Sequence, residues 1–204
     1  MKAEVDSLVR EAAIEGFEED RSVVYVLDDD LRLAYCNKAW DEFAEHNGGA
    51  HLQRIEQVGH HVLDAISEPL KAFYRSVFER SLAESTPWEH SYECSSPECY
   101  REFHMQVLPL QAPPRLVIVN SLVVEKAHER VKRAPLTAVY RTAGGIIGMC
   151  MHCRRTRRSE EPDIWDWVPE FLAKPPDNVS HGLCPTCFLY YYPQVASTMQ
   201  RGKA

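Results

Sequence analysis

The sequence lacks a long apolar segment. A membrane-spanning helix needs about 18 apolar residues in a row, and the best candidate, residues 116–124, is interrupted by Asn120 and Ser121. A basic N-terminus is also missing, because the first twenty residues hold seven acidic and two basic side chains. That sign is wrong for a signal or transit peptide. We therefore expect a cytoplasmic protein that does not bind membranes.

Motifs of common catalytic sites are missing as well. The sequence has no glycine-rich phosphate-binding loop, no nucleophile elbow around a serine and no His-Glu-x-x-His helix. His128 and Glu129 are followed by Pro135, as in the phosphoacceptor box of sensor kinases. The proline lies seven residues after the histidine, which is farther than in that box. We therefore expect neither phosphotransfer nor any other enzymatic activity.

Charge is unevenly distributed along the 204 residues. Residues 1–125 hold 11 basic and 23 acidic side chains, whereas residues 126–158 hold nine basic side chains and one acidic one, Glu129. Residues 159–204 are again acidic, with six acidic and three basic side chains. The change of sign near residue 125 indicates a domain boundary. The basic stretch favours a solvated linker, with a nucleic-acid contact as the alternative.

Hydrophobic spacing divides the first 125 residues into short elements. An amphipathic helix is expected within residues 1–20, a β-hairpin from residues 22–28 and 31–36, and a short helix capped by Asn37. A longer helical stretch follows within residues 59–85, and three strands are expected at 88–94, 100–110 and 115–125. The apolar face of the first helix consists of Val5, Leu8, Val9, Ala12, Ala13 and Phe17.

The segment VVYVLDDDLRLAYCNKAWDEFA resembles the opening of PAS sensor domains, with Asn37, Ala39 and Phe43 in their Asn-x-Ala-x-x-x-Phe helix. Gly59 stands where such domains commonly have a glycine that opens the long helix. The segment SYECSSPECYREFHMQVLPL resembles a PAS subgroup. The resemblance covers residues 21–125. It implies an α+β fold with a five-stranded antiparallel sheet, helices on one face, a pocket between them, and a role in sensing or dimerisation.

The resemblance does not name a ligand for this pocket. Strand alternation makes Tyr92, Phe103 and Met105 candidate pocket residues. A flavin adduct is not expected, because Cys36 lies at the end of a strand, whereas photoactive flavin domains use a cysteine on a helix.

Two further pairs of residues in this region could bind a cofactor or metal, or could have a purely structural role. His60 and His61 would open the long helix, the region that supplies haem ligands in some PAS domains, but surface or capping roles are favoured. Cys94 and Cys99 are separated by four residues, and turn residues are favoured over a metal or redox pair.

The strongest signal is a double pair of cysteines near the C-terminus. Cys150 and Cys153 form one C-x2-C pair, and Cys184 and Cys187 form a second, with 30 residues between the pairs. Two residues between thiolates allow one tight turn to present both sulfur atoms to one ion, and two such turns complete a tetrahedral site. A segment of about 45 residues is too short for a large core, so metal binding would contribute to its folding. We predict a structural zinc site.

Alternatives to zinc use the same cysteines. Two disulfides conflict with a cytosolic location, and redox dithiols usually occur singly. Iron in a rubredoxin-like site would have the same four ligands, and zinc is favoured because redox machinery is missing. His181 is expected to contact the site from outside, with replacement of a cysteine as the other option.

The C-terminal region also resembles a recurring bacterial signalling segment that accompanies PAS, GAF and receiver modules. The matching stretches within residues 144–192 are GIIGMCMHCRRTRR, VPEFL after Trp165 or Trp167, and SHGLCPTC. Pro169 and the insertion at residues 160–162 depart from the pattern. The resemblance implies cysteine ligation and a signalling context, without an established catalytic activity.

These features predict a PAS domain at 21–125, a connector at 126–143, a zinc-ribbon-like module at 144–192 and a tail at 193–204. The leading hypothesis is a bacterial signalling sensor or adaptor, expected as a homodimer, in which the PAS domain binds a small ligand or a partner and the zinc module is an interaction surface. One alternative is a nucleic-acid-binding regulator, and another is a haem or redox sensor. The arginines that would contact phosphate are Arg154, Arg155, Arg157 and Arg158.

Overall fold

The computed structural model describes residues 16–47, 49–66, 70–111 and 113–195. Most of the predicted N-terminal amphipathic helix and most of the tail lie outside these residues. By its contacts the chain divides into two compact units. The first contains residues 1–89 and 104–121, and the second contains residues 90–103 and 122–204. Each unit is described separately below.

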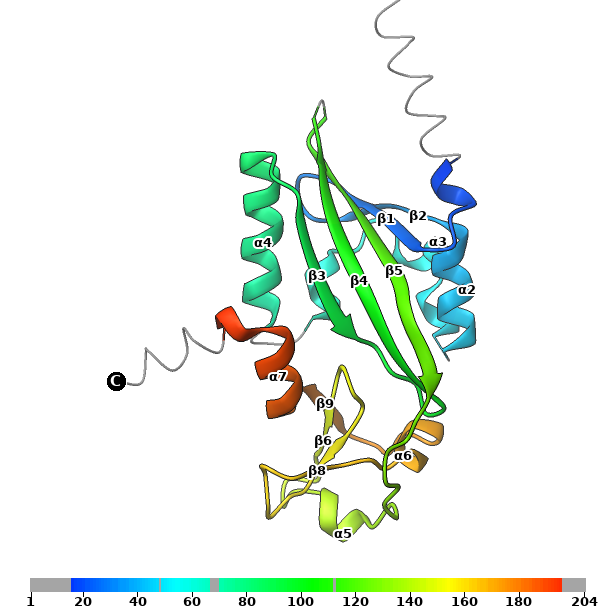
Figure 1. Cartoon of the computed structure of the whole chain (residues 1–204), viewed down its shortest axis with the longest axis vertical. Helices are drawn as coiled ribbons and strands as arrows, with labels where there is room; N and C mark the ends of the chain where they lie inside the picture. The colour runs from blue at the N-terminus through cyan, green and yellow to red at the C-terminus, as the bar shows by residue number, and fades with distance from the viewer. Residues whose placement is uncertain (1–15, 48, 67–69, 112, 196–204) are drawn as a thin grey trace, which may run out of the picture. The chain divides into compact units, whose positions relative to one another are not determined.

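The chain forms a five-stranded sheet (Figure 1), whose strands contain residues of both units. Its order is β2-β1-β5-β4-β3, and β1 pairs antiparallel with both β2 and β5. These observations confirm the α+β class and the five-stranded antiparallel sheet expected from the sequence. The strands are β1 Val23–Leu27, β2 Leu33–Cys36, β3 Trp88–Glu93, β4 Cys99–Leu110 and β5 Arg115–Ala127.

Strand β1 is buried on both faces in the first unit. Val24 and Val26 form a cluster with Val117 of β5 on one face, and Tyr25 and Leu27 are buried on the other. A strand buried on both sides reads as a continuous apolar run rather than as an alternating pattern. This explains the sequence VVYVL, and burial of each valine contributes about 1.5–3 kcal/mol.

Asn37 is fully buried where β2 passes into helix α2, Lys38–His46. Its side-chain oxygen accepts hydrogen bonds from the amides of Trp40 and Val24, at 3.2 and 3.0 Å. Its side-chain nitrogen donates to the carbonyls of Phe17 and Ser22, each at 2.9 Å. The predicted helix cap is confirmed, and the same side chain also ties β1 to α2, which contacts β1.

The long helix begins later than expected. Helix α4 spans Leu70–Glu84, whereas the described residues 60–66 after Gly59 form the short 3-10 helix η2, Val62–Ala65. Gly59 has a φ of +91°, which lies outside the right-handed helical region and suits glycine. The expectation that Gly59, His60 and His61 open the long helix was therefore wrong. Two other short elements precede them, η1 Ala50–Leu52 and α3 Arg54–Gln57.

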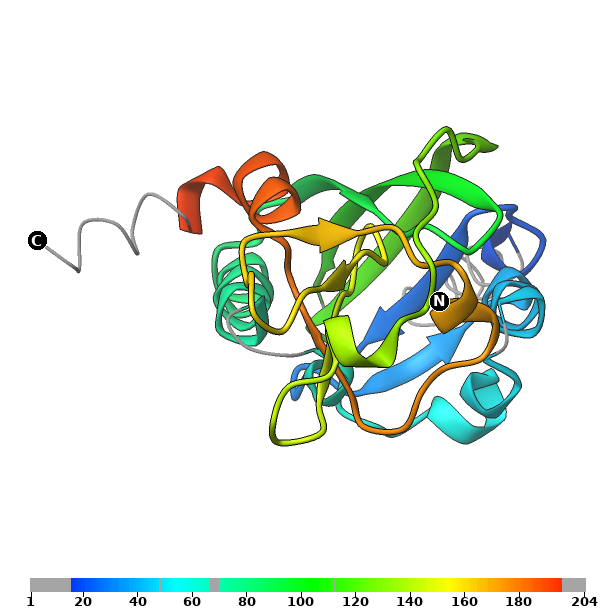
Figure 2. The same cartoon turned by 90° about the horizontal axis from the view of Figure 1, so that it is seen from below.

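The second unit contains a four-stranded sheet of its own, in the order β8-β7-β6-β9. Helices α6 and α7 lie at opposite ends of this sheet (Figures 1 and 2). The strands are β6 Ile147–Cys150, β7 Thr156–Arg157, β8 Trp165–Asp166 and β9 Val179–Gly182. The helices are α5 Thr137–Tyr140, α6 Glu170–Ala173 and α7 Pro185–Tyr191.

Tyr140, from the predicted connector, belongs to the core of this unit. Its ring packs edge-to-face on Phe171, with ring centroids 5.7 Å apart. The complete buried cluster consists of Tyr140, Ile147, Met149, Val168 and Phe171. Part of the stretch between the two predicted modules is therefore folded into the second unit.

Candidate metal centre

Four buried cysteines converge in the second unit. Their sulfur atoms all lie within 4.8 Å of one another, and those of Cys153 and Cys184 are 3.6 Å apart. Zinc–sulfur bonds of about 2.3 Å in a tetrahedron imply sulfur–sulfur separations of about 3.8 Å. The predicted ligands Cys150, Cys153, Cys184 and Cys187 therefore form a group with the size and chemistry of a four-sulfur metal site.

Pairing of two distant strands brings the cysteine pairs together. Strands β6 and β9 are parallel neighbours, with Cys150 opposite Gly182. Cys184 follows two residues later and caps helix α7, whose first turn holds Cys187. The chain turns back after Cys153 through Arg154, which has a φ of +60°. The first pair therefore lies at a strand end and its turn, and the second pair lies at the start of a helix.

Backbone amides point at two of the sulfur atoms. The amide of Cys184 donates to Sγ of Cys150, and the amide of Cys187 donates to Sγ of Cys184, each at 3.4 Å. Such donors favour the thiolate, as does the partial positive charge at the N-terminus of a helix. The local backbone is thus arranged for negatively charged sulfur.

The thiols perturb one another strongly. Hydrogen bonding with Cys153 lowers the pKa of Cys150, whereas hydrogen bonding with Cys150 raises the pKa of Cys153 and of Cys187. Four adjacent thiols cannot all ionise without a compensating cation, because like charges in a buried site repel. A bound divalent cation would allow all four to be thiolates.

His152 lies between the first two cysteines, and its role was not anticipated from the sequence. Its side chain is buried, its ring stacks on Tyr191 at 5.3 Å, and its Nε2 is 2.9 Å from the hydroxyl of Tyr192. Burial lowers the pKa of His152 to about 4, so the imidazole is neutral at neutral pH. In the sequence, the position of His152 between Cys150 and Cys153 was the one feature that could have indicated this role.

His181 does not join the cysteine group. It lies exposed on β9, opposite Met149 in the pairing of β9 with β6. Within the described part of the chain, the group of possible metal ligands comprises the four cysteines alone. The option that His181 replaces a cysteine is therefore not supported.

Two of the four arginines in the basic segment have partners inside the second unit. Arg158 forms ion pairs with Asp166 and Glu161, each at 2.7 Å, and Arg154 donates to the carbonyl of Ser95 at 3.4 Å. The two carboxylates offset the charge of Arg158, whereas the neutral carbonyl of Ser95 leaves the charge of Arg154 unchanged.

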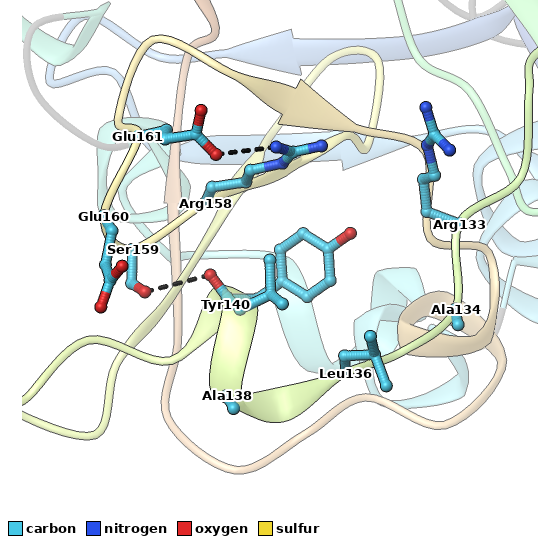
Figure 3. A pocket seen from close by; sticks show the side chains of 10 residues that line it. Arg133, Ala134, Leu136, Ala138, Tyr140, Arg158, Ser159, Glu160 and Glu161 are labelled. Atoms are coloured by element: carbon cyan, nitrogen blue, oxygen red, sulfur yellow. Dashed lines mark hydrogen bonds and ion pairs between the residues drawn. The ribbon is translucent and has the colours of Figure 1, made fainter.

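A cavity of about 480 Å³ lies beside α5 in the second unit (Figure 3). Leu136 and Val139 contribute apolar lining to this cavity, and Arg133 and Arg158 contribute polar lining. Most polar groups here already have partners, because Ser159 donates to the carbonyl of Val139 at 3.0 Å and Arg158 is ion-paired. Leu136 is 60% exposed, so the cavity offers an apolar surface rather than a set of free polar groups.

The predicted PAS pocket residues fall into different units. Tyr92 stacks on Phe103 in the second unit, with centroids 5.8 Å apart, and Met105 belongs to the first unit. Phe103 and Met105 are buried, which shows that this face of β4 points inward. Their role in binding a ligand stays a prediction.

The remaining histidine and cysteine candidates have ordinary environments. His61 accepts a hydrogen bond from the amide of Leu63 at 3.2 Å, in agreement with a capping role. Nε2 of His128 is 2.8 Å from the carbonyl of Ser96. Burial raises the pKa of Cys36 to about 12, which disfavours a reactive thiolate.

Cys94 and Cys99 are both free and half-buried. Cys94 directly follows β3 and Cys99 begins β4, as expected for residues of a turn between strands.

No helix among the described residues is both long enough and apolar enough to cross a membrane.

No protein-family model matches the chain, and no curated protein matches it. Among solved structures, the chain is similar to the PAS domain of BvgS from Bordetella pertussis, with 16% identity and a TM-score of 0.45 over 59% of this chain and 89% of that one. It is also similar to the PAS domain of the RpfR quorum-sensing receptor from Cronobacter turicensis, solved in complex with BDSF. That match has 17% identity and a TM-score of 0.40 over 52% of this chain and 97% of that one. A PAS domain of an HTR-like protein from Haloarcula marismortui has 13% identity and a TM-score of 0.37, over 60% and 100% of the two chains.

Proposed function

We propose that the protein is a non-enzymatic signal-transduction sensor or adaptor. In this proposal a PAS-type domain senses a small ligand or mediates dimerisation, and a zinc-containing module provides an interaction surface. The PAS motif around Asn37 supports the first part, together with the five-stranded sheet into which it folds. The observation that carries the second part is the cluster of four buried cysteines.

A structural rather than a catalytic ion is favoured by the ligand set. Catalytic zinc sites keep an open position for water or substrate, whereas four cysteines fill a tetrahedral site. All four side chains are at most 4% exposed, so a substrate has no direct path to the ion. When bound, the zinc ion would supply cross-linking of β6, its following turn and the start of α7.

The chain's own residues prepare the site for this ion. Parallel pairing of β6 with β9 aligns the two pairs, and amide donors favour thiolates at Cys150 and Cys184. Tyr192 and Tyr191 contact the neutral ring of His152, which lies between the two cysteines of the first pair.

Elemental analysis of the purified full chain tests the metal. We expect one zinc per chain, a colourless solution, and loss of the zinc in Cys153→Ser. Cys94→Ser is the matched control, because Cys94 is free and lies outside the cluster. A Soret band would favour the haem alternative, a ferric four-sulfur spectrum would favour iron, and a metal-free chain would overturn the zinc module.

Native mass spectrometry of the same sample tests the proposed homodimer. A dimer mass supports dimerisation through the PAS domain if it persists in Cys153→Ser, which changes only the metal module. A monomer in both proteins would remove the dimerisation role and leave ligand sensing as the function of the first unit.

A further inference from the structure

One arginine in the second unit links the first cysteine pair to the end of a strand. Nη1 of Arg130 donates to the carbonyl of Cys153 at 2.6 Å, and its Nη2 donates to Oε1 of Glu93 at 2.5 Å. The side chains of Arg130 and Glu93 are only 14% and 6% exposed. Glu93 is the last residue of β3, and Arg130 comes three residues after the end of β5.

The guanidinium of Arg130 is enclosed by aromatic rings. It lies 5.1 Å from the centre of the Trp167 ring and 5.9 Å from that of Tyr100. A planar guanidinium can stack on rings while its edge donates in two directions, which a lysine ammonium cannot do. The environment therefore selects arginine and holds its orientation.

A second connection runs beside the first. Ser95 donates its hydroxyl hydrogen to Glu93, and its amide donates to the carbonyl of His152 at 3.3 Å. Two consecutive carbonyls of the first cysteine pair, those of His152 and Cys153, are thus hydrogen-bonded to the same network around Glu93. Because these carbonyls belong to the turn that presents two metal ligands, the network restrains the positions of the sulfur atoms.

We propose that Arg130 and Glu93 are positioning residues for the metal centre and couple its occupancy to the ends of β3 and β5. The inference rests on the proposed zinc site. A movement of either strand end displaces the donor to the Cys153 carbonyl and weakens metal binding. Coupling of this kind is reciprocal, so the metal stabilises the same arrangement of the strand ends by an equal factor. Strands β3 and β5 both begin with residues of the first unit, and the hydrogen bonds of Arg130 connect their ends in the second unit to the carbonyl of Cys153 and to Glu93.

Metal release measures the positioning role. Zinc-loaded full-length protein is mixed with an excess of a chromophoric chelator, and the rate of zinc transfer is recorded. We expect Arg130→Gln and Glu93→Gln to release zinc roughly tenfold faster, on the scale of one lost charge-assisted hydrogen bond. Arg133→Gln and Glu98→Gln are matched controls with the same charge changes at exposed positions, and we expect their rates to stay within about twofold of the original.

Hydrogen exchange distinguishes coupling from simple destabilisation. In the unaltered protein, zinc removal should raise amide exchange in residues 90–103. In Arg130→Gln this zinc-dependent difference should fall below about half of its value in the unaltered protein. The reason is that the end of β3 is already released from the cysteine pair when zinc is bound. Arg130→Lys keeps the charge but cannot donate to both partners, and it should give an intermediate difference.

Three results would overturn the coupling. The first is zinc release at the original rate in both Arg130→Gln and Glu93→Gln. The second is an amide exchange in Arg130→Gln that exceeds that of the unaltered protein by the same amount with and without zinc. Such a result indicates that Arg130 has a structural role alone. If the unaltered chain binds no zinc, both the coupling and the proposed metal site are overturned, whereas the first two results leave the metal site standing.

Discussion

Removal of the metal should unfold the cysteine module while the first unit keeps its structure. Apparent binding free energies of structural zinc are about 10–16 kcal/mol in small modules, and whole domains are stable by only about 5–15 kcal/mol. The buried cluster around Tyr140 contains five side chains, which is a small core. The ion therefore contributes a free energy comparable to the whole stability of an ordinary domain, and we expect its loss to unfold a module with so small a core.

The two units can be followed separately by hydrogen exchange with peptide resolution. After zinc is removed by a chelator, we expect peptides in residues 144–192 to approach full exchange within minutes. Peptides covering β1 and α2 should keep most of their protection, because their core is formed by Val24, Val26 and Val117. Readdition of zinc should restore the original pattern. Persistent protection of residues 144–192 in metal-free protein would refute the reasoning, since the module would then fold on its own core.

Three further predictions concern single side chains. Asn37→Ala should lower the free energy of unfolding by about 2–4 kcal/mol, because a cap and several buried hydrogen bonds are lost; urea denaturation measures this, and a loss below about 1 kcal/mol would contradict it. Tyr192→Phe should cost about 1–3 kcal/mol by removing the buried partner of His152, observed as a lower melting temperature of the zinc-loaded protein. The hydrogen bond from Tyr35, followed by that from Arg54, lowers the pKa of Glu18, so this carboxylate contributes stability above its unfolded pKa that is lost as pH falls through the folded value. The stability difference between the unaltered protein and Glu18→Gln should therefore shrink from pH 7 to about pH 3.5; metal release at low pH affects both proteins alike, and a difference that does not change with pH would contradict the assignment.

Local sequence patterns predicted much of the first unit correctly. The hairpin of β1 and β2, the cap at Asn37 and the three later strands follow from alternation, turn residues and capping chemistry, which act over a few neighbouring positions. The predicted start of the long helix was wrong because the apolar spacing does not report the backbone conformation at Gly59. The apolar spacing continues through Leu63, whereas the φ of +91° at Gly59 directs the chain into a turn before α4 begins.

The four metal ligands were also identified from spacing, because C-x2-C pairs report the local geometry of a turn. What surrounds them could not be predicted in this way. The alignment of the pairs depends on β6 pairing with β9 across about thirty residues of chain, and the contact of Arg130 with Cys153 and Glu93 joins three separate segments.

Residue order along the chain was enough to indicate the order of strands and helices and the cysteines that could hold an ion, since both depend on short-range spacing, and the resemblance to PAS domains implied the class of fold. Only the folded chain shows that Tyr140 belongs to a core, that His152 contacts two tyrosines, and that a partly buried ion pair between Arg130 and Glu93 contacts the first cysteine pair. These features arise from burial and charge pairing between distant segments, and their free energies exist only once the chain has brought those segments together.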